Sequence, residues 1–333
     1  MPLTALASAN RHAILRARKK VKAGEKRLVR QMVFCGAIVI AALGMAPVAR
    51  AADPAPCLDI VKRYEAIKPQ ISAIEVSLTL FSAVDGNCVA LVTELLDQGA
   101  SIDARDRFGA RPLSHAARFG HLPMVELLLA RGAPIDARNL AGATALYAAA
   151  ENNRTPVALA LIERGADVNL PGRSNVSPIS AAAFKGNAAI VDALLARGAR
   201  DDEADKTGKT AIVYAVAAAR FDVVKRLLSK QVDVNARYPN DLTLLMWACG
   251  PDEAAQEGEA VKVVQRLLEA GAAIDDQDDR GRTALMIAAE GGHAGIVDLL
   301  LARGADRSLK DKSGKRAGDL TVMTALRKRL APR

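Results

Sequence analysis

The chain has 333 residues, of which 50% are hydrophobic and only 3% aromatic, and its formal net charge is +9. Residues 1–51 carry ten basic side chains and one acidic one, which leaves equal numbers of both in residues 52–333. The positive charge therefore belongs to the N-terminal segment and does not indicate nucleic-acid binding. Thin layers of small and aliphatic side chains suit this composition better than one thick core.

Residues 1–51 have the pattern of a bacterial-type secretory signal. A basic stretch precedes the apolar run 32–49, and Ala49-Arg50-Ala51 follows as an A-x-A cleavage site. We expect cleavage after Ala51 and a periplasmic or secreted mature protein. The alternative is an uncleaved N-terminal membrane anchor, because the apolar run is close to the shortest length that spans a bilayer. Otherwise no membrane association is expected.

Residues 52–76 are predicted to form an N-terminal helical cap, with one short helix between Pro56 and Pro69. Outside the leader the sequence has three cysteines. In an oxidising compartment Cys57 and Cys88 would pair as a disulfide, whereas the alternative is two reduced, buried side chains. Cys249 is expected to be buried and free.

Glycine recurs at a fixed step through the rest of the chain. The step is 33 residues over most of its length, and it predicts a stack of short repeated units. The first series comprises Gly99, Gly132, Gly165, Gly198, Gly271 and Gly304. Gln231 occupies a glycine slot of this series, which predicts a local irregularity after residue 228.

A second series marks a turn in each unit. It comprises Gly109, Gly142, Gly208, Gly281 and Gly314, with Asn175 and Asp241 in two of its slots. Asn and Asp are the residues other than glycine that best tolerate a positive φ, so the same backbone turn is expected there.

Each unit carries the signals of two short helices. Thr144, Ser177, Thr210, Thr243 and Thr283 stand at the predicted N-cap of the first helix, where Arg111 takes their place in one unit. The second helix has a V-x-x-L-L stripe, as in Val125, Leu128 and Leu129, which lies on one helical face.

The pattern resembles the ankyrin repeat. It is clearest in DRFGARPLSHAARFGHLPMVELLLARGAPIDA (106–137) and DDRGRTALMIAAEGGHAGIVDLLLARGADRS (278–308). The resemblance implies an all-α solenoid of stacked helix-turn-helix units joined by β-turn or hairpin loops. We expect about seven to eight repeats in residues 77–330, with an acidic insertion at 248–262 and a capping half-repeat at 311–330.

Catalytic motifs are missing from the sequence. It has no P-loop, nucleophile elbow, dinucleotide fingerprint or zinc-spaced His/Cys pair, so we expect no enzyme, cofactor or metal. His121 and His293 occupy a structural slot of the repeat, and His115 is a lone helix residue. The acid-rich segments 201–205 and 275–279 fit turn hydrogen bonding better than calcium binding.

The resemblance implies that a protein partner docks on the concave face, which first helices and turn tips form. The residues in those slots are Arg107, Phe108, Arg118, Phe119, Leu140, Glu151, Asn152, Arg173, Phe184, Lys185, Lys206, Lys209, Arg280 and Arg282. Their phenylalanines and arginines are typical of interface anchors, although packing of Phe against the next repeat is the alternative. Their basic character favours an acidic partner.

We therefore expect a monomeric, exported, non-enzymatic scaffold for protein-protein interaction. Two alternatives remain open: an escort or protective factor for a periplasmic enzyme of the envelope, and a secreted effector that acts on a host protein. The insertion at 248–262 either selects the partner or is a solvated excursion.

Overall fold

The computed structural model describes residues 55–228, 232–250 and 257–331. The predicted leader, Gln231 and residues 251–256 of the predicted insertion lie outside this part of the chain. All regular elements within it are helices, and one isolated antiparallel bridge joins Tyr238 to Leu242. The predicted all-α class is confirmed.

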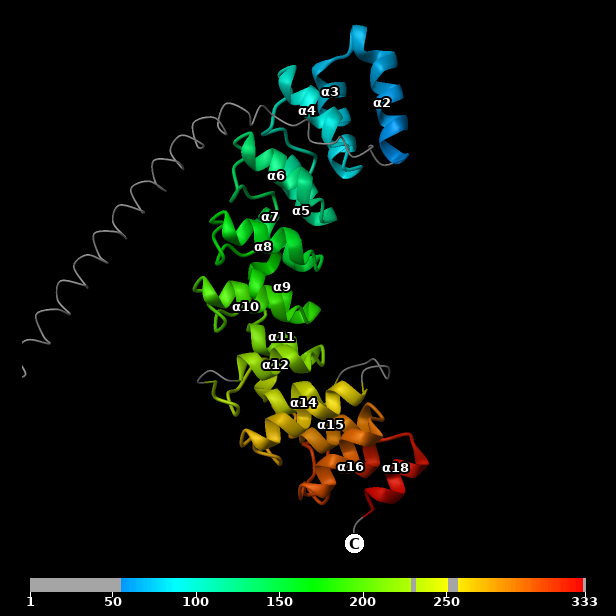
Figure 1. Cartoon of the computed structure of the whole chain (residues 1–333). Helices are drawn as coiled ribbons and strands as arrows, with labels where there is room; N and C mark the ends of the chain where they lie inside the picture. Colours follow the sequence, from blue (N-terminus) through cyan, green and yellow to red (C-terminus); the bar gives the residue numbers. More distant parts are fainter. Residues whose placement is uncertain (1–54, 229–231, 251–256, 332–333) are drawn as a thin grey trace, which may run out of the picture. The chain divides into compact units, whose positions relative to one another are not determined.

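The helices follow one another along the stack in chain order (Figure 1). After α2 (Ala55–Ile67) and the 3-10 helix η1 (Lys68–Gln70), the sixteen helices α3 to α18 form eight pairs. These pairs are α3 (Ala73–Asp85) with α4 (Val89–Asp97), α5 (Pro112–Phe119) with α6 (Leu122–Ala130), α7 (Ala145–Glu151) with α8 (Thr155–Glu163), α9 (Pro178–Lys185) with α10 (Ala188–Ala196), α11 (Ala211–Ala217) with α12 (Phe221–Leu227), α13 (Leu244–Ala248) with α14 (Glu257–Glu269), α15 (Ala284–Glu290) with α16 (Ala294–Ala302), and α17 (Ala317–Leu320) with α18 (Thr324–Arg329).

The pairs build two layers. The first helix of each pair packs on the first helices of its neighbours, and most second helices pack on second helices in the same way. The layer of first helices is the tighter one, because alanines such as Ala149 and Ala182 are fully buried where helices meet. Leucines and valines of the second helices, such as Val125 and Leu128, are also fully buried and complete a continuous core.

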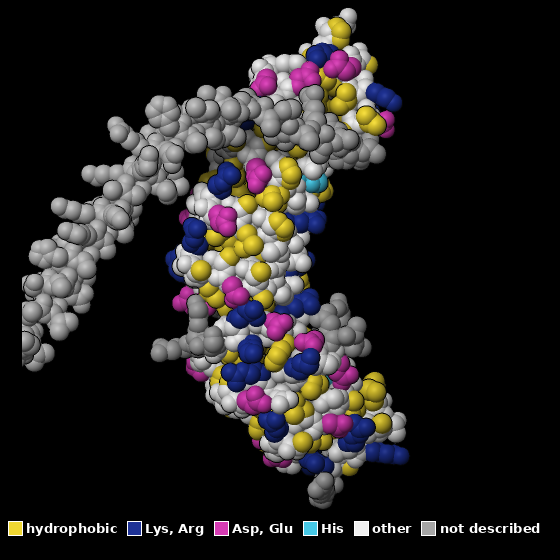
Figure 2. All heavy atoms as spheres, viewed as in Figure 1, with side chains coloured by type: hydrophobic (Ala, Val, Ile, Leu, Met, Phe, Trp, Pro, Cys, Tyr) yellow, Lys and Arg dark blue, Asp and Glu magenta, His cyan; other side chains and the backbone are white. Residues whose placement is uncertain are grey.

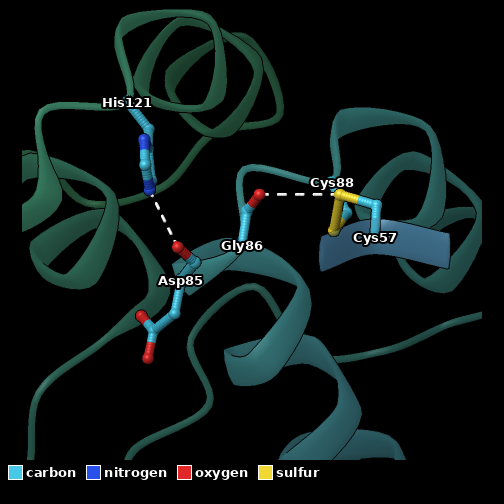
Figure 3. The surroundings of a disulfide bond; sticks show 5 residues. All are labelled: Cys57, Asp85, Gly86, Cys88 and His121. Carbon is cyan, nitrogen blue, oxygen red and sulfur yellow. Dashed lines mark hydrogen bonds between the residues drawn. A yellow bond between two sulfur atoms is a disulfide. The ribbon is translucent and has the colours of Figure 1, made fainter. Parts of the chain in front are cut away.

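The N-terminal cap is tied to the first pair through α2. Cys57 and Cys88 form a disulfide with a Cα–Cα distance of 5.4 Å, and a sulfur of this bond approaches the carbonyl oxygen of Gly86 (Figure 3). The buried Tyr64 donates its hydroxyl hydrogen to Gln98 Oε1 at 2.5 Å. Because Ser72 and Glu75 form a capping box, α3 starts at Ala73, four residues before the predicted start of the repeats.

Helix caps differ between repeats as the sequence predicts, with one exception. The hydroxyls of Thr144, Ser177, Thr243 and Thr283 each accept the backbone N–H three residues ahead. Thr210 makes no such side-chain bond, and Arg111 makes none either. Pro112 still starts α5 without cost, because the first helical N–H has no partner within the helix.

The turn tips are closed by an Asp or Asn side chain. Asp106 Oδ1, for example, accepts the N–H groups of Phe108 and Ala110, both at 2.8 Å. The same bonds are made by Asn139, Asp205, Asp278 and Asp311. Two of these lie in the acid-rich segments 201–205 and 275–279, so these carboxylates serve the turns.

Two tips lack that acceptor because Gly172 and Tyr238 occupy its slot. There the backbone forms the 3-10 turns η2 (Arg173–Asn175) and η3 (Pro239–Asp241) instead. The predicted positive φ at Asn175 and Asp241 is confirmed, and the residue before each of them also has a positive φ. These tips therefore differ in backbone course from their siblings.

Two irregular segments differ from the prediction, and a third lies outside the described residues. The insertion was expected to be a loop, but residues from Glu257 onward extend the N-terminus of α14, where acidic side chains suit the helix dipole. Residues 311–330 were expected to form a half-repeat, and they contain both helices, α17 and α18, in shortened form. The irregularity predicted after residue 228 falls on residues 229–231 and stays a prediction.

Candidate interaction surface

Four large apolar side chains stand out of the repeats at the positions the sequence singled out. Phe108, Leu140, Phe119 and Phe184 are exposed by 58%, 80%, 40% and 46% respectively. Phe108 and Leu140 lie at neighbouring turn tips, which are joined by a hydrogen bond from Leu140 N to Phe108 O at 3.0 Å. Phe119 is the last residue of α5, and Phe184 is the second-to-last residue of α9.

The alternative of packing against the next repeat holds in part for Phe184. Its ring meets the ring of Tyr214, which belongs to α11, edge to face at 6.2 Å between centroids. Nearly half of the Phe184 side chain still faces solvent. This contact orients the ring but leaves one side of it open.

A groove of about 310 Å³ lies beside Phe184, between the first helices and tips of three successive repeats. We call it the central groove. It is lined by Tyr147, Glu151, Arg173, Ser174, Val176, Ala181, Phe184, Lys185, Asp205, Thr207, Lys209 and Tyr214. Five predicted partner-binding residues thus meet in one place, namely Glu151, Arg173, Phe184, Lys185 and Lys209.

The two acidic side chains of the central groove are engaged by groups of the protein itself. Glu151 pairs with Arg173 and also accepts the hydroxyl of Tyr147 at 3.3 Å. Burial and the nearby charge of Glu151 raise the pKa of Tyr147 to about 12, so this phenol remains a neutral donor.

Asp205 is enclosed more fully. It accepts the Tyr214 hydroxyl at 2.6 Å and the backbone N–H groups of Thr207 and Lys209. Burial acts to raise the pKa of Asp205, but these hydrogen bonds outweigh it and hold the pKa below its usual range. Burial and the bond to Asp205 raise the pKa of Tyr214. The carboxylate is therefore ionised, with its charge shared among donors.

The remaining predicted residues fall outside the central groove. Arg107 lies over the Phe108 ring and Arg118 over the Phe119 ring, at 4.7 and 5.6 Å from the centroids. Asn152 donates to Ala148 O of its own helix. The side chain of Lys206 is exposed at a tip.

Arg280 and Arg282 line a second hollow between the last two tips. Arg282 is ion-paired with both Asp278 and Glu290, so its charge is already neutralised.

Seven of the twelve lining residues escaped the sequence prediction, among them Tyr147, Asp205 and Tyr214. In the slot of Tyr147 the two adjacent repeats have Ser114 and Ser180, and in the slot of Tyr214 the two preceding repeats have Ala148 and Ala181. A large aromatic side chain in such a slot was the available signal, because it must open a space or fill one.

His115 lies in helix α5, as predicted, but it is not the lone residue that was expected. Its Nδ1 lies 2.8 Å from Asp85 Oδ1 and its Nε2 3.1 Å from Asp106 Oδ2. Burial acts to lower the pKa of His115, but the two carboxylates outweigh it and raise the pKa above its usual value. The side chain of His115 thus links the first two repeats.

The side chain in the His121 position of the repeat forms a hydrogen bond to the preceding repeat. His121 Nε2 donates to Asp85 O at 2.9 Å (Figure 3). Arg154 and Arg220, one and three units further along, donate in the same way to Arg118 O and Phe184 O. At these three positions the slot therefore holds adjacent repeats together.

Within the ranges that the structure describes, no group of three or more His, Cys, Asp or Glu side chains is arranged to hold a metal ion. None of the helices described there has the length and apolar character that a membrane crossing requires.

Comparison with known proteins identifies the repeat. A family model described as ankyrin repeats (3 copies) matches residues 80–172, 173–238, 217–311 and 245–328. Human ankyrin repeat domain-containing protein 63 is 33% identical over 116 residues, which cover 34% of this chain and 30% of that protein. The mouse protein of the same name is also 33% identical over 116 residues, 34% of this chain and 29% of that protein.

Human NAD-capped RNA hydrolase NUDT12 is 39% identical over 69 residues, which cover 21% of this chain and 15% of that protein. The chain thus spans less than a third of the length of each of these relatives, and the shared segments are repeats. Ankyrin-repeat domains are typically non-catalytic scaffolds for protein-protein interaction, and by its matched repeats this chain belongs to the ankyrin-repeat family.

Proposed function

We propose that the chain is an exported scaffold that holds a protein partner against its first helices and turn tips. One observation carries the proposal: Phe108, Phe119 and Phe184 are exposed on one succession of tips and helix ends, in a chain that contains only six Phe. Exposed aromatic side chains beside cations are the usual anchors of an interface. A monomer would leave this surface free for the partner.

Two features support export. The pattern of residues 1–51 is that of a secretory signal, and the Cys57–Cys88 disulfide is a bond that persists in oxidising compartments. N-terminal sequencing of the protein recovered from the periplasm or medium tests this proposal. We expect Ala52 as the first residue. A full-length chain retained in the membrane fraction would support the anchor instead, and a full-length chain in the cytoplasm would refute export.

Affinity capture from an envelope extract tests the scaffold. The Phe108→Ala, Phe119→Ala and Phe184→Ala triple variant should lose most of its captured partner while its helical circular dichroism stays unchanged. Partner capture that is unchanged in this variant would refute the proposed surface.

A matched control removes exposed apolar side chains elsewhere. Leu58, Ile74 and Leu78 in α2 and α3 are exposed by 60%, 73% and 62%. Their triple alanine variant removes a comparable amount of exposed apolar surface at the N-terminal cap, so it should capture the partner normally. Loss in both variants would mean that capture reflects general stickiness of apolar side chains.

A further inference from the structure

Four cations of the repeats lie over aromatic rings rather than against carboxylates. The pairs are Arg107 with Phe108, Arg118 with Phe119, Lys185 with Phe184 and Lys209 with Trp247, at 4.7, 5.6, 5.7 and 5.2 Å from cation to centroid. These distances lie within the range of cation–π attraction, which leaves the positive charge available to an external anion.

Two of these cations border the central groove. Lys185 follows Phe184 at the end of α9, and Lys209 lies at the tip before α11. Neither ammonium makes an ion pair with any residue in the described ranges, whereas Arg173 is paired with Glu151. The groove therefore has two positive charges without an acidic counterpart.

The walls of the groove complete its chemistry. Tyr147, Tyr214 and Phe184 supply aromatic surface, and Val176 and Ala181 supply aliphatic surface. A volume of about 310 Å³ holds roughly one or two side chains and is too small for a folded element. The fitting ligand is therefore a short stretch of extended chain that has one carboxylate and one apolar side chain.

A nucleic acid fits this groove less well. Glu151 and Asp205 lie on its wall and would repel a continuous phosphate backbone. Figure 2 shows basic, acidic and apolar side chains interspersed on the face it views, without a broad basic stripe along the stack. A single carboxylate can contact the lysines without approaching the acids, because Arg173 and Tyr214 already cover them.

We propose that the central groove is the anchoring subsite for an acidic peptide segment of the partner. A Glu or Asp side chain lies between Lys185 and Lys209, and an adjacent apolar side chain packs on Phe184 and Tyr214. This inference rests on the proposed scaffold function and specifies the chemistry of its partner.

A random twelve-residue peptide library displayed on phage, selected against the full chain, tests the inference. The selected peptides should share an acidic residue next to an apolar one. Affinities of the synthetic peptides are then measured by fluorescence anisotropy with three single variants, Lys185→Gln, Lys209→Gln and Lys225→Gln. Lys225 is an exposed lysine of the second-helix layer in α12, so its variant is a control with the same loss of charge.

Lys185→Gln and Lys209→Gln should each weaken peptide binding roughly fivefold, because a partly exposed ion pair contributes up to about that factor. Lys225→Gln should leave it within about twofold, and raising NaCl from ~50 to ~500 mM should weaken it. Selection of no peptide, peptides without acidic residues, or affinities indifferent to both lysines would overturn the inference. Tighter lysine-dependent binding of a twelve-nucleotide single-stranded DNA would overturn it as well.

The two proposals fail separately. If the partner depends on the phenylalanines but acidic peptides do not depend on the lysines, only the groove assignment is wrong. If the triple phenylalanine variant captures its partner normally, the scaffold surface is wrong, whatever the peptides do.

Discussion

Breaking the Cys57–Cys88 bond should loosen the N-terminal cap and leave the repeats intact. The two cysteines are 31 residues apart, and the chain-entropy model gives roughly 3.5 kcal/mol for a cross-link of that span. Because each repeat of a solenoid contacts only its neighbours, the loss should fall on α2 and the first pair. Opening of α2 should then become about 10²- to 10³-fold more frequent.

Hydrogen exchange followed by mass spectrometry measures this opening region by region. Treatment with a reductant should accelerate exchange in residues 55–67, while α15 and α16 stay protected. The Cys57→Ala and Cys88→Ala double variant should reproduce this result without reductant. Cys249 is fully buried and already free, so the reductant has no second target among the described cysteines. Exchange in α2 that changes less than threefold would refute the reasoning, and the packing of Tyr64 would then be sufficient to hold the cap.

Three further outcomes follow from single contacts. The pKa of His115 is raised in the folded chain, so its contribution to stability is complete below about pH 6.5 and is lost as the pH rises through the folded pKa. The urea midpoint of the native chain should therefore fall as the pH rises above about 6.5, and that of His115→Gln should not. Thr243→Ala removes a cap bond and should lower the free energy of unfolding by about 1 kcal/mol, more than Thr210→Ala, whose side chain makes none. Gly281→Ala should lower the free energy of unfolding more than Gly304→Ala in denaturant melts, although both glycines have a positive φ. A Cβ at residue 281 would lie 2.9 Å from the backbone nitrogen of Lys312, whereas Gly304 has open space around it.

The regular part of the fold could be predicted because equivalent positions of successive repeats have the same packing and therefore the same residue types. In most units glycine follows the end of a helix, a hydroxyl starts one, and a leucine stripe faces its own layer, so one period predicts the next. The tips at Ser174 and Asn240 departed from the period because their acceptor slot holds Gly172 or Tyr238. Those two slots could have been recognised from the sequence by following the Asp and Asn series.

The groove and the His115 link were harder to predict. His115 and Asp85 are 30 residues apart, and only the docking of one repeat on the next brings them together. The positive charge of the groove depends on which lysines and arginines lack an ion pair. Side-chain geometry within each repeat decides this. Arg282 and Lys209 occupy equivalent tips in the sequence pattern, yet Arg282 reaches Asp278 and Glu290 while Lys209 lies over a ring. A repeat pattern cannot distinguish these two outcomes.

Lys185 has a second physical role that must be separated from binding. It stands in the last turn of α9, where a positive charge is favourable by about 0.3–1 kcal/mol through the helix dipole. The end of α9 is nevertheless determined by Gly186, whose left-handed backbone lets its N–H and the next one close on the last carbonyls of the helix. Lys185→Gln should therefore change the free energy of unfolding by less than about 0.5 kcal/mol in a denaturant titration. Lys185→Arg should preserve peptide affinity as well, because it keeps the charge above Phe184; a loss of binding in that variant with normal stability would mean that the ammonium geometry, rather than the charge, is what the peptide recognises.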